Sequence, residues 1–437
     1  MNINVGMVSL GCSKNTVDSE TMLGLLRDRG YRIVSDPAKA DVIIVNTCGF
    51  IESAKQESID TILEMAQYKE SGRLKKLIVT GCLSQRYPQD LYEGLPEVDA
   101  FMGVNDFENL PDLLEKALAG ERPLRCETSN KFPKVERMLT TPPFSAYVKI
   151  SDGCDNKCTY CAIPLIRGKY VSRPYEDIME ECRLLASKGV TELTFIAQDT
   201  SRYGNDFPGK PLLLKRLLHE ASEIPGIRWV RVLYCYPDTV NEELLKEIHD
   251  NPKIAPYLDL PLQHIDDDML RSMNRRGTSE HIKAMLKLCR KYGILVRTTM
   301  MVGFPGETDE QFDTLLSFVK EFRFDRLGAF TYSPEDGTVG AEMDNQIDEE
   351  VKNQRLDALM MAQQAISFEI NKERVGKTYE AVIEGFEDGA YVARSIYESP
   401  ESDGIIRVET DEELAVGQFI NVRITDCDAY DLMGVKE

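Results

Sequence analysis

Three cysteines stand close together in the middle of the chain, with the spacing C-x₃-C-x₂-C. They are Cys154, Cys158 and Cys161. Cysteine thiolates are soft ligands that favour iron–sulfur clusters or zinc. A closed electron-transfer cluster needs four protein ligands, so three cysteines on one loop would leave one iron of a [4Fe–4S] cluster open to a small molecule. The spacing indicates a catalytic cluster. The alternatives are a structural zinc site completed by a distant histidine, or three unrelated cysteines.

The residues around these cysteines resemble the signature of the radical S-adenosylmethionine (SAM) superfamily. Residues 146–150 predict a short strand just before the loop, and the aromatic Tyr160 precedes the last cysteine. The resemblance implies that the open iron binds the amino and carboxylate groups of SAM. It also implies that Tyr160 lies near the adenine, and that one electron from the cluster cleaves SAM to a 5′-deoxyadenosyl radical.

Three further cysteines lie in the first part of the chain, each just after a predicted strand. They are Cys12, Cys48 and Cys82, and the predicted strands are residues 3–8, 41–45 and 77–80. Helical stretches separate the strands, which predicts a parallel α/β domain. Ligands of such sheets gather at the carboxyl ends of the strands, so we expect a second metal site here. The alternative is three small cysteines packed in the core.

A second series of strands and helices begins after a proline-rich break at residues 120–145. Its six predicted strands are residues 146–150, 192–197, 229–233, 257–260, 294–301 and 326–330. Six βα units fit a partial (β/α)₆ barrel, whose site lies at the C-terminal ends of the strands. From residue 377 the pattern changes to short β runs separated by turns. These predict a small antiparallel β-barrel of about sixty residues, so the whole chain is an α/β protein with a C-terminal β part.

Composition limits the class of protein. The 437 residues include 42% hydrophobic residues and carry a formal net charge of −21. Nucleic acids attract basic surfaces, so this charge argues against a general nucleic-acid-binding protein and favours a basic protein partner. Eleven cysteines, an odd number, do not form a secreted disulfide framework and suggest a reducing compartment. No apolar run approaches the ~20 residues of a membrane span, so we expect a soluble, cytoplasmic protein without a membrane partner.

Together, the three parts resemble the methylthiotransferase family of radical SAM enzymes over essentially the whole chain. The motifs that carry this resemblance are residues 9–15 (SLGCSKN), 17–20 (VDSE), 46–48 (NTC) and 81–87 (GCLSQRY). The domains that the resemblance implies are an N-terminal methylthiotransferase domain at 1–120, a linker at 121–143, a radical SAM barrel at 144–373 and a TRAM β-barrel at 376–437.

The resemblance also implies two [4Fe–4S] clusters and SAM as cofactors. The auxiliary cluster, which receives or relays sulfur, would be bound by Cys12, Cys48 and Cys82. The catalytic cluster would be bound by Cys154, Cys158 and Cys161. An electron donor such as a flavodoxin or ferredoxin would reduce the catalytic cluster.

The family has two broad branches, one acting on an adenosine of transfer RNA and the other on an aspartate of ribosomal small-subunit protein S twelve. Residues 11–15 (GCSKN) and 197–204 (AQDTSRYG) resemble the second branch. The implied reaction adds a methylthio group to the β-carbon of the aspartate. No side-chain acid or base removes an unactivated C–H hydrogen at a useful rate, so a cofactor must supply the radical. A second SAM would supply the methyl group to sulfur.

Residues at the other strand ends are candidates for holding SAM. The resemblance places Gln198 and Asp199 near the methionyl amine, and it places Gly303, Gly306 and Glu307 beside the adenosine, where glycine allows close approach. Arg297 is a candidate for the SAM carboxylate or for a structural ion pair. His264 either lines the pocket or is a satisfied structural histidine. The remaining cysteines are interpreted as packing residues: Cys126, Cys182, Cys235, Cys289 and Cys427.

Residues 376–437 contain five basic and fifteen acidic residues, a net formal charge of −10. A domain that grips RNA should be basic, because phosphate neutralisation supplies much of the affinity. An acidic barrel suits a basic ribosomal protein, although acidity can also serve solubility alone. We therefore expect no RNA contact through the TRAM domain. The rival functions are transfer-RNA methylthiolation and a non-catalytic iron–sulfur electron-transfer or sensor protein.

Overall fold

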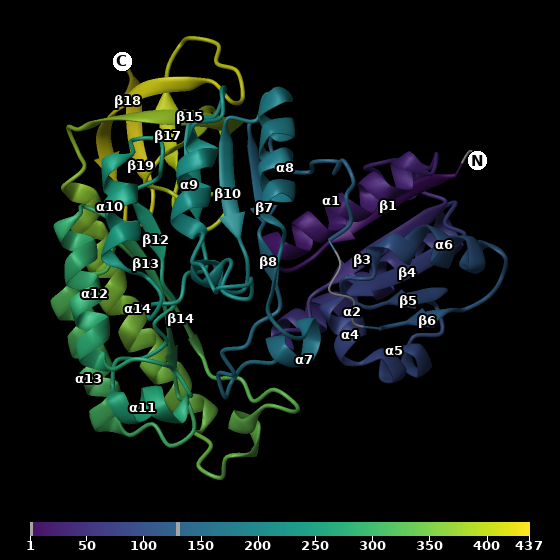
Figure 1. The fold of residues 1–437 in the computed structure, drawn as a ribbon, viewed down its shortest axis with the longest axis horizontal. Coiled ribbons are helices and arrows are strands. Elements are labelled where there is room, and N and C mark those ends of the chain that lie inside the picture. Colours follow the sequence, from purple (N-terminus) through teal and green to yellow (C-terminus); the bar gives the residue numbers. More distant parts are fainter. Residues whose placement is uncertain (1–2, 128–131) are drawn as a thin grey trace.

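The computed structural model describes residues 3–127 and 132–437. It has three parts, which Figure 1 shows as an N-terminal sheet with helices on the right, a central partial barrel on the left and a small C-terminal barrel above the central one. Residues 1–2 and 128–131, which belong to the predicted N-terminal domain and linker, lie outside the described residues. Within the described ranges, no helix is long and apolar enough to cross a membrane.

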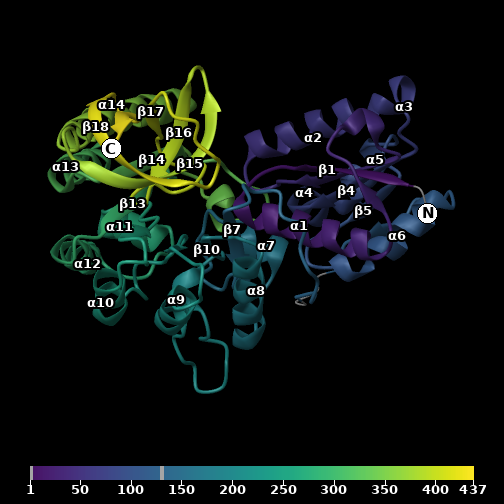
Figure 2. The same cartoon turned by 90° about the horizontal axis from the view of Figure 1, so that it is seen from above.

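The N-terminal part is a six-stranded parallel sheet in the order β2-β1-β3-β4-β5-β6. Its central strands are runs of buried Val, Ile and Leu, because helices cover both faces of the sheet (Figure 2). The strands are β1 (Asn4–Ser9), β2 (Arg32–Ile33), β3 (Val42–Thr47), β4 (Lys76–Gly81), β5 (Ala100–Met102) and β6 (Leu124–Arg125). The helices are α1 (Ser13–Asp28), α2 (Glu52–Ala66), α3 (Tyr68–Ser71), α4 (Cys82–Arg86), α5 (Pro88–Gly94) and α6 (Leu110–Leu118), with 3₁₀ turns η1 (Pro37–Lys39) and η2 (Phe107–Asn109). Strand β6 lies within the stretch predicted as a linker.

The central part contains six parallel strands in two three-stranded sheets, β7-β10-β11 and β12-β13-β14. A parallel bridge between Val230 and Ile254 connects the two sheets into one partial barrel. The strands are β7 (Ser145–Lys149), β10 (Glu192–Ile196), β11 (Trp229–Val232), β12 (Tyr257–Asp259), β13 (Leu295–Val302) and β14 (Arg326–Thr331). A short hairpin is formed by β8 (Ser151–Asp152) and β9 (Val171–Ser172).

Helices surround this barrel on its outer face (Figure 1). The helices of the central part are α7 (Ile163–Arg167), α8 (Tyr175–Ser187), α9 (Leu214–Ser222), α10 (Glu242–Asp250), α11 (Asp267–Ser272), α12 (Ser279–Lys291), α13 (Asp309–Phe322) and α14 (Glu349–Lys372), with 3₁₀ turns η3 (Thr200–Arg202) and η4 (Val339–Glu342). Of these, α7 lies against α4 of the N-terminal part rather than on the outer face of the barrel. The predicted fold class, with a parallel N-terminal sheet and a partial barrel of six βα units, is confirmed.

Alternate side chains along each barrel strand face either the helices or the lumen. On β7, Ala146 and Val148 pack into the main core with the surrounding helices. Tyr147 instead joins a second cluster, with Tyr257 of β12 and Val17 of α1. Helix α1 of the N-terminal part therefore contacts the inward-facing side chains of the barrel.

The C-terminal part is a closed barrel of five strands in the order β15-β16-β17-β19-β18. Its strands are β15 (Thr378–Glu387), β16 (Ala390–Ser395), β17 (Ile406–Glu409), β18 (Phe419–Cys427) and β19 (Leu432–Lys436). All neighbouring pairs are antiparallel except β17 and β19, which are parallel. The predicted small β-barrel is confirmed, and β19 is an additional strand.

Buried ion pairs attach this small barrel to the N-terminal ends of the central strands. Arg394 of β16 donates two hydrogen bonds to Glu192 at the start of β10, at 3.0 and 2.5 Å. The side chain of Glu192 is 0% exposed. The hydroxyl of Tyr257, at the start of β12, donates to Asp403 at 2.8 Å. Part of the acidic charge of the small barrel is therefore used inside the protein, in contacts with the central barrel.

We expect the Arg394→Met variant to lose about 3–5 kcal/mol of unfolding free energy, because the buried Glu192 carboxylate would lose its bidentate partner. Urea unfolding can be followed by the fluorescence of Trp229, the single tryptophan, whose ring packs 4.8 Å from that of Phe419 of the small barrel. Arg423→Met is the matched control, since Arg423 forms an exposed pair on the same barrel. Equal stability of the two variants would contradict the prediction.

Candidate active site between the N-terminal sheet and the barrel

The three N-terminal cysteines lie at the carboxyl ends of three adjacent strands. Cys12 follows β1, Cys48 follows β3 and Cys82 follows β4. A Cβ atom at Gly11 would lie 3.2 Å from the Sγ of Cys48, and one at Gly49 would lie 3.0 Å from the carbonyl carbon of Cys82. The three loops therefore touch, and they place three thiols at one edge of the sheet.

The surroundings of these thiols suit a site that binds metal through sulfur. Burial raises the pKa of Cys82 to about 11 and also raises the pKa of Cys48. Burial acts in the same direction on Cys12, but Lys14 and Arg167 outweigh it and lower the pKa of that thiol. Metal binding would favour the thiolates, and a donor set of three sulfurs fits an iron–sulfur cluster. No three His, Cys, Asp or Glu side chains of the described residues surround a position for a single metal ion.

The second set of cysteines lies on the loop between β8 and α7, beyond the carboxyl end of β7. Lys157 in this loop adopts φ 55°, in the left-handed region, so the chain curls between Cys154 and Cys158. At Gly153, with φ 73°, a Cβ would lie 2.1 Å from the carbonyl oxygen of Lys169, so only glycine fits. Burial raises the pKa of Cys154 to about 11. The loop thus presents a second trio of sulfur donors at the barrel mouth.

Tyr160 and Arg275 lie beside this loop. The Nη1 of Arg275 donates to the hydroxyl of Tyr160 at 3.2 Å. The guanidinium of Arg275 also lies 4.2 Å from the ring centre of Tyr236, which follows β11. Sequence reasoning selected Tyr160 but missed Arg275, because an arginine more than a hundred residues from the cysteine loop carries no signal in local spacing.

Gln198 and Asp199 follow β10 at the same mouth. The amide nitrogen of Gln198 donates to Asp152 at 3.0 Å, while its Oε1 is buried and has no hydrogen-bond partner among the described residues. Asp199 accepts hydrogen bonds from Asn156 at 2.8 Å and Ser201 at 2.7 Å, and burial raises its pKa. The unused oxygen of Gln198 is an acceptor suited to an ammonium group of a ligand.

The glycine loop after β13 is held by a buried carboxylate. Glu307 accepts a hydrogen bond from the backbone nitrogen of Gly303 at 2.7 Å and one from Arg355 at 2.6 Å. The Nε2 of His264 lies 3.1 Å from the same carboxyl group. Gly303 and Gly306 both have positive φ, at 71° and 81°. His264 is therefore a structural histidine whose hydrogen-bonding capacity is satisfied. Glu307 fixes the loop through its hydrogen bond with the backbone of Gly303.

Arg297 of β13 points into the barrel lumen and is paired there. Its Nη1 donates to Asp259 of β12 at 3.2 Å, and its Nε lies 3.7 Å from Asp403 of the small barrel. The structure thus contains the ion pair that sequence reasoning left as the alternative. Contact of Arg297 with the SAM carboxylate stays a prediction, and it requires the guanidinium to share these carboxylates with the ligand.

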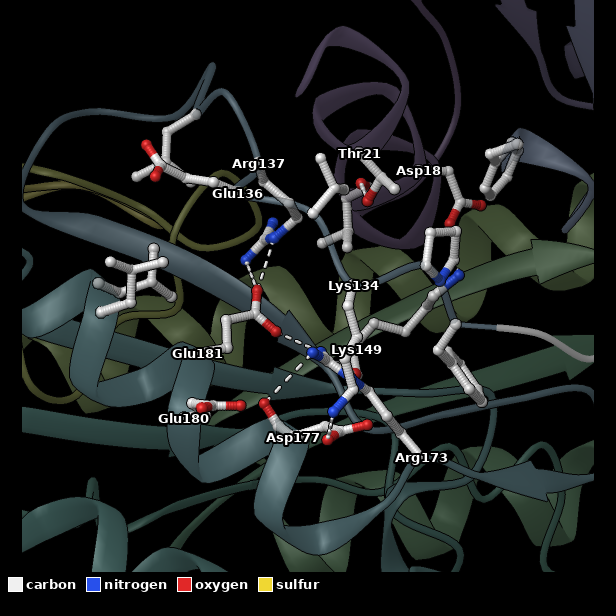
Figure 3. A pocket seen from close by; sticks show the side chains of 18 of the residues that line it. Asp18, Thr21, Lys134, Glu136, Arg137, Lys149, Arg173, Asp177, Glu180 and Glu181 are labelled. Carbon is white, nitrogen blue, oxygen red and sulfur yellow. Dashed lines mark hydrogen bonds and ion pairs between the residues drawn. The ribbon is translucent and has the colours of Figure 1, made fainter. Parts of the chain in front are cut away.

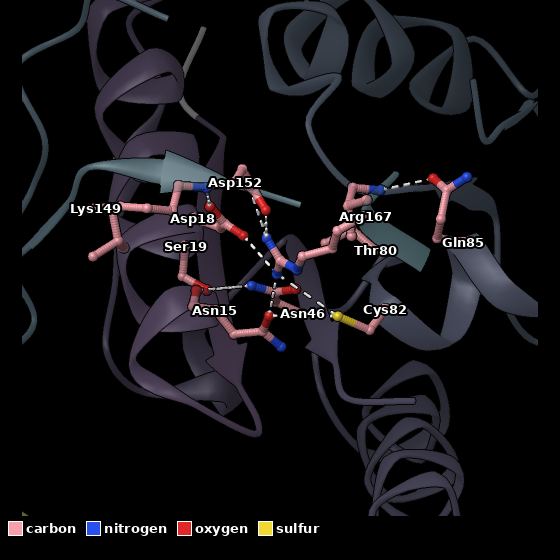
Figure 4. A network of polar contacts seen from close by, with 12 residues as sticks. Asn15, Asp18, Ser19, Asn46, Thr80, Cys82, Gln85, Lys149, Asp152 and Arg167 are labelled. Atoms are coloured by element: carbon pink, nitrogen blue, oxygen red, sulfur yellow. Dashed lines mark hydrogen bonds and ion pairs between the residues drawn. The ribbon is translucent and has the colours of Figure 1, made fainter. Parts of the chain in front are cut away.

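A buried network of charges lies beside Cys82 and includes Asp152, two residues before Cys154 (Figure 4). Arg167 of α7 is 2% exposed and donates to Asp152 at 3.0 Å and to Asp18 of α1 at 2.9 Å. Its Nη2 also lies 3.7 Å from the Sγ of Cys82. Lys149 of β7 contacts both of these carboxylates. Burial opposes ionisation of Asp152, but Arg167 and Lys149 hold its pKa well below the ordinary value. The network joins α1 to the barrel and fixes the two cysteine loops relative to each other.

A cavity of about 390 Å³, lined in part by Lys149, lies between α1, the linker and α8 (Figure 3). Arg137 of the linker crosses it. This arginine donates to Glu20 of α1 at 2.5 Å and to Glu181 of α8 at 2.6 Å. Arg137 is therefore paired with a carboxylate on each side of the cavity, and it attaches the linker to both neighbouring domains.

Comparisons with known proteins found a matching family model for each of the three parts and relatives over the whole chain. Sequence models of the Uncharacterized protein family UPF0004, the radical SAM superfamily and the TRAM domain match residues 4–103, 148–319 and 375–436. The chain is 50% identical over 434 residues to the ribosomal protein uS12 methylthiotransferase RimO of Thermoanaerobacter sp., covering 99% of both chains. It is 48% identical over 438 residues to the protein of the same name from Clostridioides difficile, covering 99% of this chain and 98% of that one.

The chain belongs to the ribosomal protein uS12 methylthiotransferase family. Among solved structures, it resembles the radical S-adenosylmethionine methyltransferase TsrM from Kitasatospora setae, with a TM-score of 0.58 and 15% identity over 78% of this chain and 76% of that one. At this identity the likeness shows a shared fold. Membership of a radical SAM methylthiotransferase family implies one [4Fe–4S] cluster and SAM as cofactors.

Proposed function

We propose that this protein adds a methylthio group to the β-carbon of an aspartate in ribosomal protein uS12. The proposal follows the family to which the chain belongs. The observation that carries it is the position of the two cysteine sets. Arg167 lies 3.7 Å from the Sγ of Cys82 in the N-terminal set and donates to Asp152, two residues before Cys154 of the loop 154–161, so both sets adjoin the same network. A substrate between them would face sulfur-bound metal on both sides.

In this proposal, Cys12, Cys48 and Cys82 hold an auxiliary [4Fe–4S] cluster, and Cys154, Cys158 and Cys161 hold the catalytic one. When bound, the two clusters and SAM would together supply a 5′-deoxyadenosyl radical to remove the C–H hydrogen and a methylthio group to add to the carbon. The chain itself supplies the ligands and their spacing. Arg167 fixes that spacing, since its guanidinium binds Asp18 of the N-terminal part and Asp152 of the barrel. A structure held this rigidly favours correct orientation of the reacting atoms.

The strand-end residues are proposed to position SAM. The unpartnered Oε1 of Gln198 would accept from the methionyl amine, with Asp199 beside it. Tyr160, held by Arg275, would lie along the adenine. Gly303 and Gly306 would let the backbone approach the adenosine, because neither has a side chain in the way. Glu307 would act indirectly by fixing that loop.

One experiment tests the function directly. The protein, with its clusters reconstituted, is incubated with SAM and a reductant, and with uS12 or transfer RNA in separate reactions. Mass spectrometry of uS12 should find the mass increase of one methylthio group, with the modification at a single aspartate. A flavodoxin or ferredoxin should replace the chemical reductant, because we propose such a protein as electron donor. A modified transfer RNA and unmodified uS12 would favour the rival substrate.

The acidic side of the small barrel is the proposed contact for uS12. Glu409, Asp411 and Glu413 are exposed, unlike Glu398 and Asp403, which face the central barrel. Reversing these three exposed charges to lysine should weaken uS12 binding, mainly by slowing association, since complementary charges steer encounter. Stopped-flow association rates should differ most at low salt. The difference should shrink at physiological ionic strength, where the Debye length is ~8 Å.

A reversal of the same size elsewhere is the control. Glu57, Asp60 and Glu64 are exposed on α2, so changing them to lysine alters the net charge equally. Iron content and SAM cleavage should be normal in both variants. If the two triple variants associate with uS12 at the same rate at low salt, the small barrel does not guide this partner.

A further inference from the structure

Lys14 occupies the space between the auxiliary cysteines and the barrel mouth. It is the second residue of α1, two positions after Cys12, and is 8% exposed. Its Nζ lies 3.1 Å from the ring centre of Tyr234, which follows β11 at the C-terminal end. The neighbouring Ser13 hydroxyl lies 3.4 Å from the hydroxyl of the same tyrosine. The ammonium group is thus held at the junction of the two domains.

Lys14 differs from the other buried cations of this junction because it forms no ion pair with a carboxylate, although its charge acts on nearby Asp259. Arg167 and Lys149 share two carboxylates, and Arg297 has Asp259. Within residues 3–127 and 132–437, the Nζ of Lys14 makes no hydrogen bond or ion pair, and its partner is the face of Tyr234. A buried ammonium is strongly favoured by an anionic partner, so this position suits a negatively charged ligand.

Tyr234, whose ring contacts the ammonium of Lys14, has an unusual backbone conformation. Tyr234 has φ 61°, in the left-handed region that aromatic residues rarely adopt. Its backbone nitrogen donates to Asp259 at 3.0 Å, which fixes the turn. Backbone outliers of this kind cluster at functional sites. The turn presents the tyrosine ring to Lys14 and keeps the ammonium at the junction rather than in solvent.

We propose that Lys14 binds the side-chain carboxylate of the substrate aspartate. The inference rests on the proposed function, which brings one aspartate side chain between the two cysteine sets. The carboxylate would supply the direct ion-pair partner that Lys14 lacks, through a charge-assisted hydrogen bond. Because Lys14 lies two residues from Cys12, the β-carbon next to this carboxylate would lie beside the auxiliary cysteines. An adenosine has no carboxylate, so Lys14 would also select protein over transfer RNA.

Removing the charge from the substrate aspartate, from Lys14 or from both tests this contact. The holoenzyme, without reductant, is titrated by calorimetry with uS12 and with uS12 in which the modified aspartate is asparagine. We expect the parent to bind the aspartate form about 10- to 100-fold more tightly, the range of one hydrogen bond to a charged group. Lys14→Met should lose this preference, Lys14→Arg should keep it, and the exposed-lysine control Lys39→Met should behave like the parent.

Other readouts separate the outcomes. Lys14→Met should keep its full iron content, because Lys14 is not a metal ligand, and the charge-conserving Lys14→Arg should release 5′-deoxyadenosine at the parent rate. An undiminished preference for aspartate in Lys14→Met would overturn the proposal, and so would loss of half the iron, which would assign the charge to the auxiliary cysteines. If the parent with reductant leaves uS12 unmodified, the proposed function fails. If the parent modifies uS12 but Lys14→Met still prefers aspartate, only the role of Lys14 is wrong.

Discussion

The variant in which Cys154, Cys158 and Cys161 are all alanine is expected to keep about four of about eight irons and to release no 5′-deoxyadenosine. No other cysteine lies on this loop, so the triple variant leaves it without a thiol. The N-terminal cysteines belong to another sheet and should still hold their iron. Iron analysis and chromatography of SAM products measure both effects.

A cysteine outside both sites provides the control. Cys289 of α12 is buried and packs 3.7 Å from the sulfur of Met285. Cys289→Ala should therefore retain all the iron and normal SAM cleavage, with a modest loss of stability. An unchanged iron content in the triple variant would show that the loop binds no cluster.

Replacing Cys12, Cys48 and Cys82 by alanine should separate the two halves of the reaction. SAM cleavage should continue, because the loop 154–161 and the strand-end residues of the barrel are unchanged. Methylthio transfer should vanish, because the auxiliary sulfur ligands are gone. The measurements are iron content, 5′-deoxyadenosine release and the mass of uS12 from the same reaction. Full modification of uS12 by this variant would mean that the three thiols only fill space at the sheet edge.

The fold was predictable where apolar runs are long. Strands such as β3 and β10 are five or six buried residues followed by polar turns, and such runs stand out in the sequence. Strands β2, β6, β8 and β9 have two residues each and carry no period that could indicate a strand. The strand β6 also lies among the prolines that indicated a linker, and its pairing with β5 depends on the rest of the sheet.

The candidate metal-binding cysteines were selected by their spacing and by their positions just after strands, and their ligand roles stay predictions. The charged residues between them were not found. Arg167 and Asp18 are 149 positions apart, and nothing local to either indicates that they meet. Lys14 was read only as part of a motif. In the small barrel, the net charge was counted correctly, but the count could not separate Asp403, which faces inward, from Glu409, which is exposed.

The contact between Glu192 and Arg394 has a consequence for the order of folding during translation. The two residues are 202 positions apart, so the arginine is synthesised long after the strand that carries Glu192. Domains generally fold as units from the N-terminus while the ribosome is still adding residues. Until the C-terminal strands have been synthesised, the carboxylate of Glu192, which is buried in the complete fold, is therefore exposed at the base of the central barrel. A ribosome that stops before residue 376 would release a chain in which Glu192 lacks its pair with Arg394 and keeps only the longer contact with Arg231, at 3.4 Å. Such a chain is a natural target for chaperones and proteases.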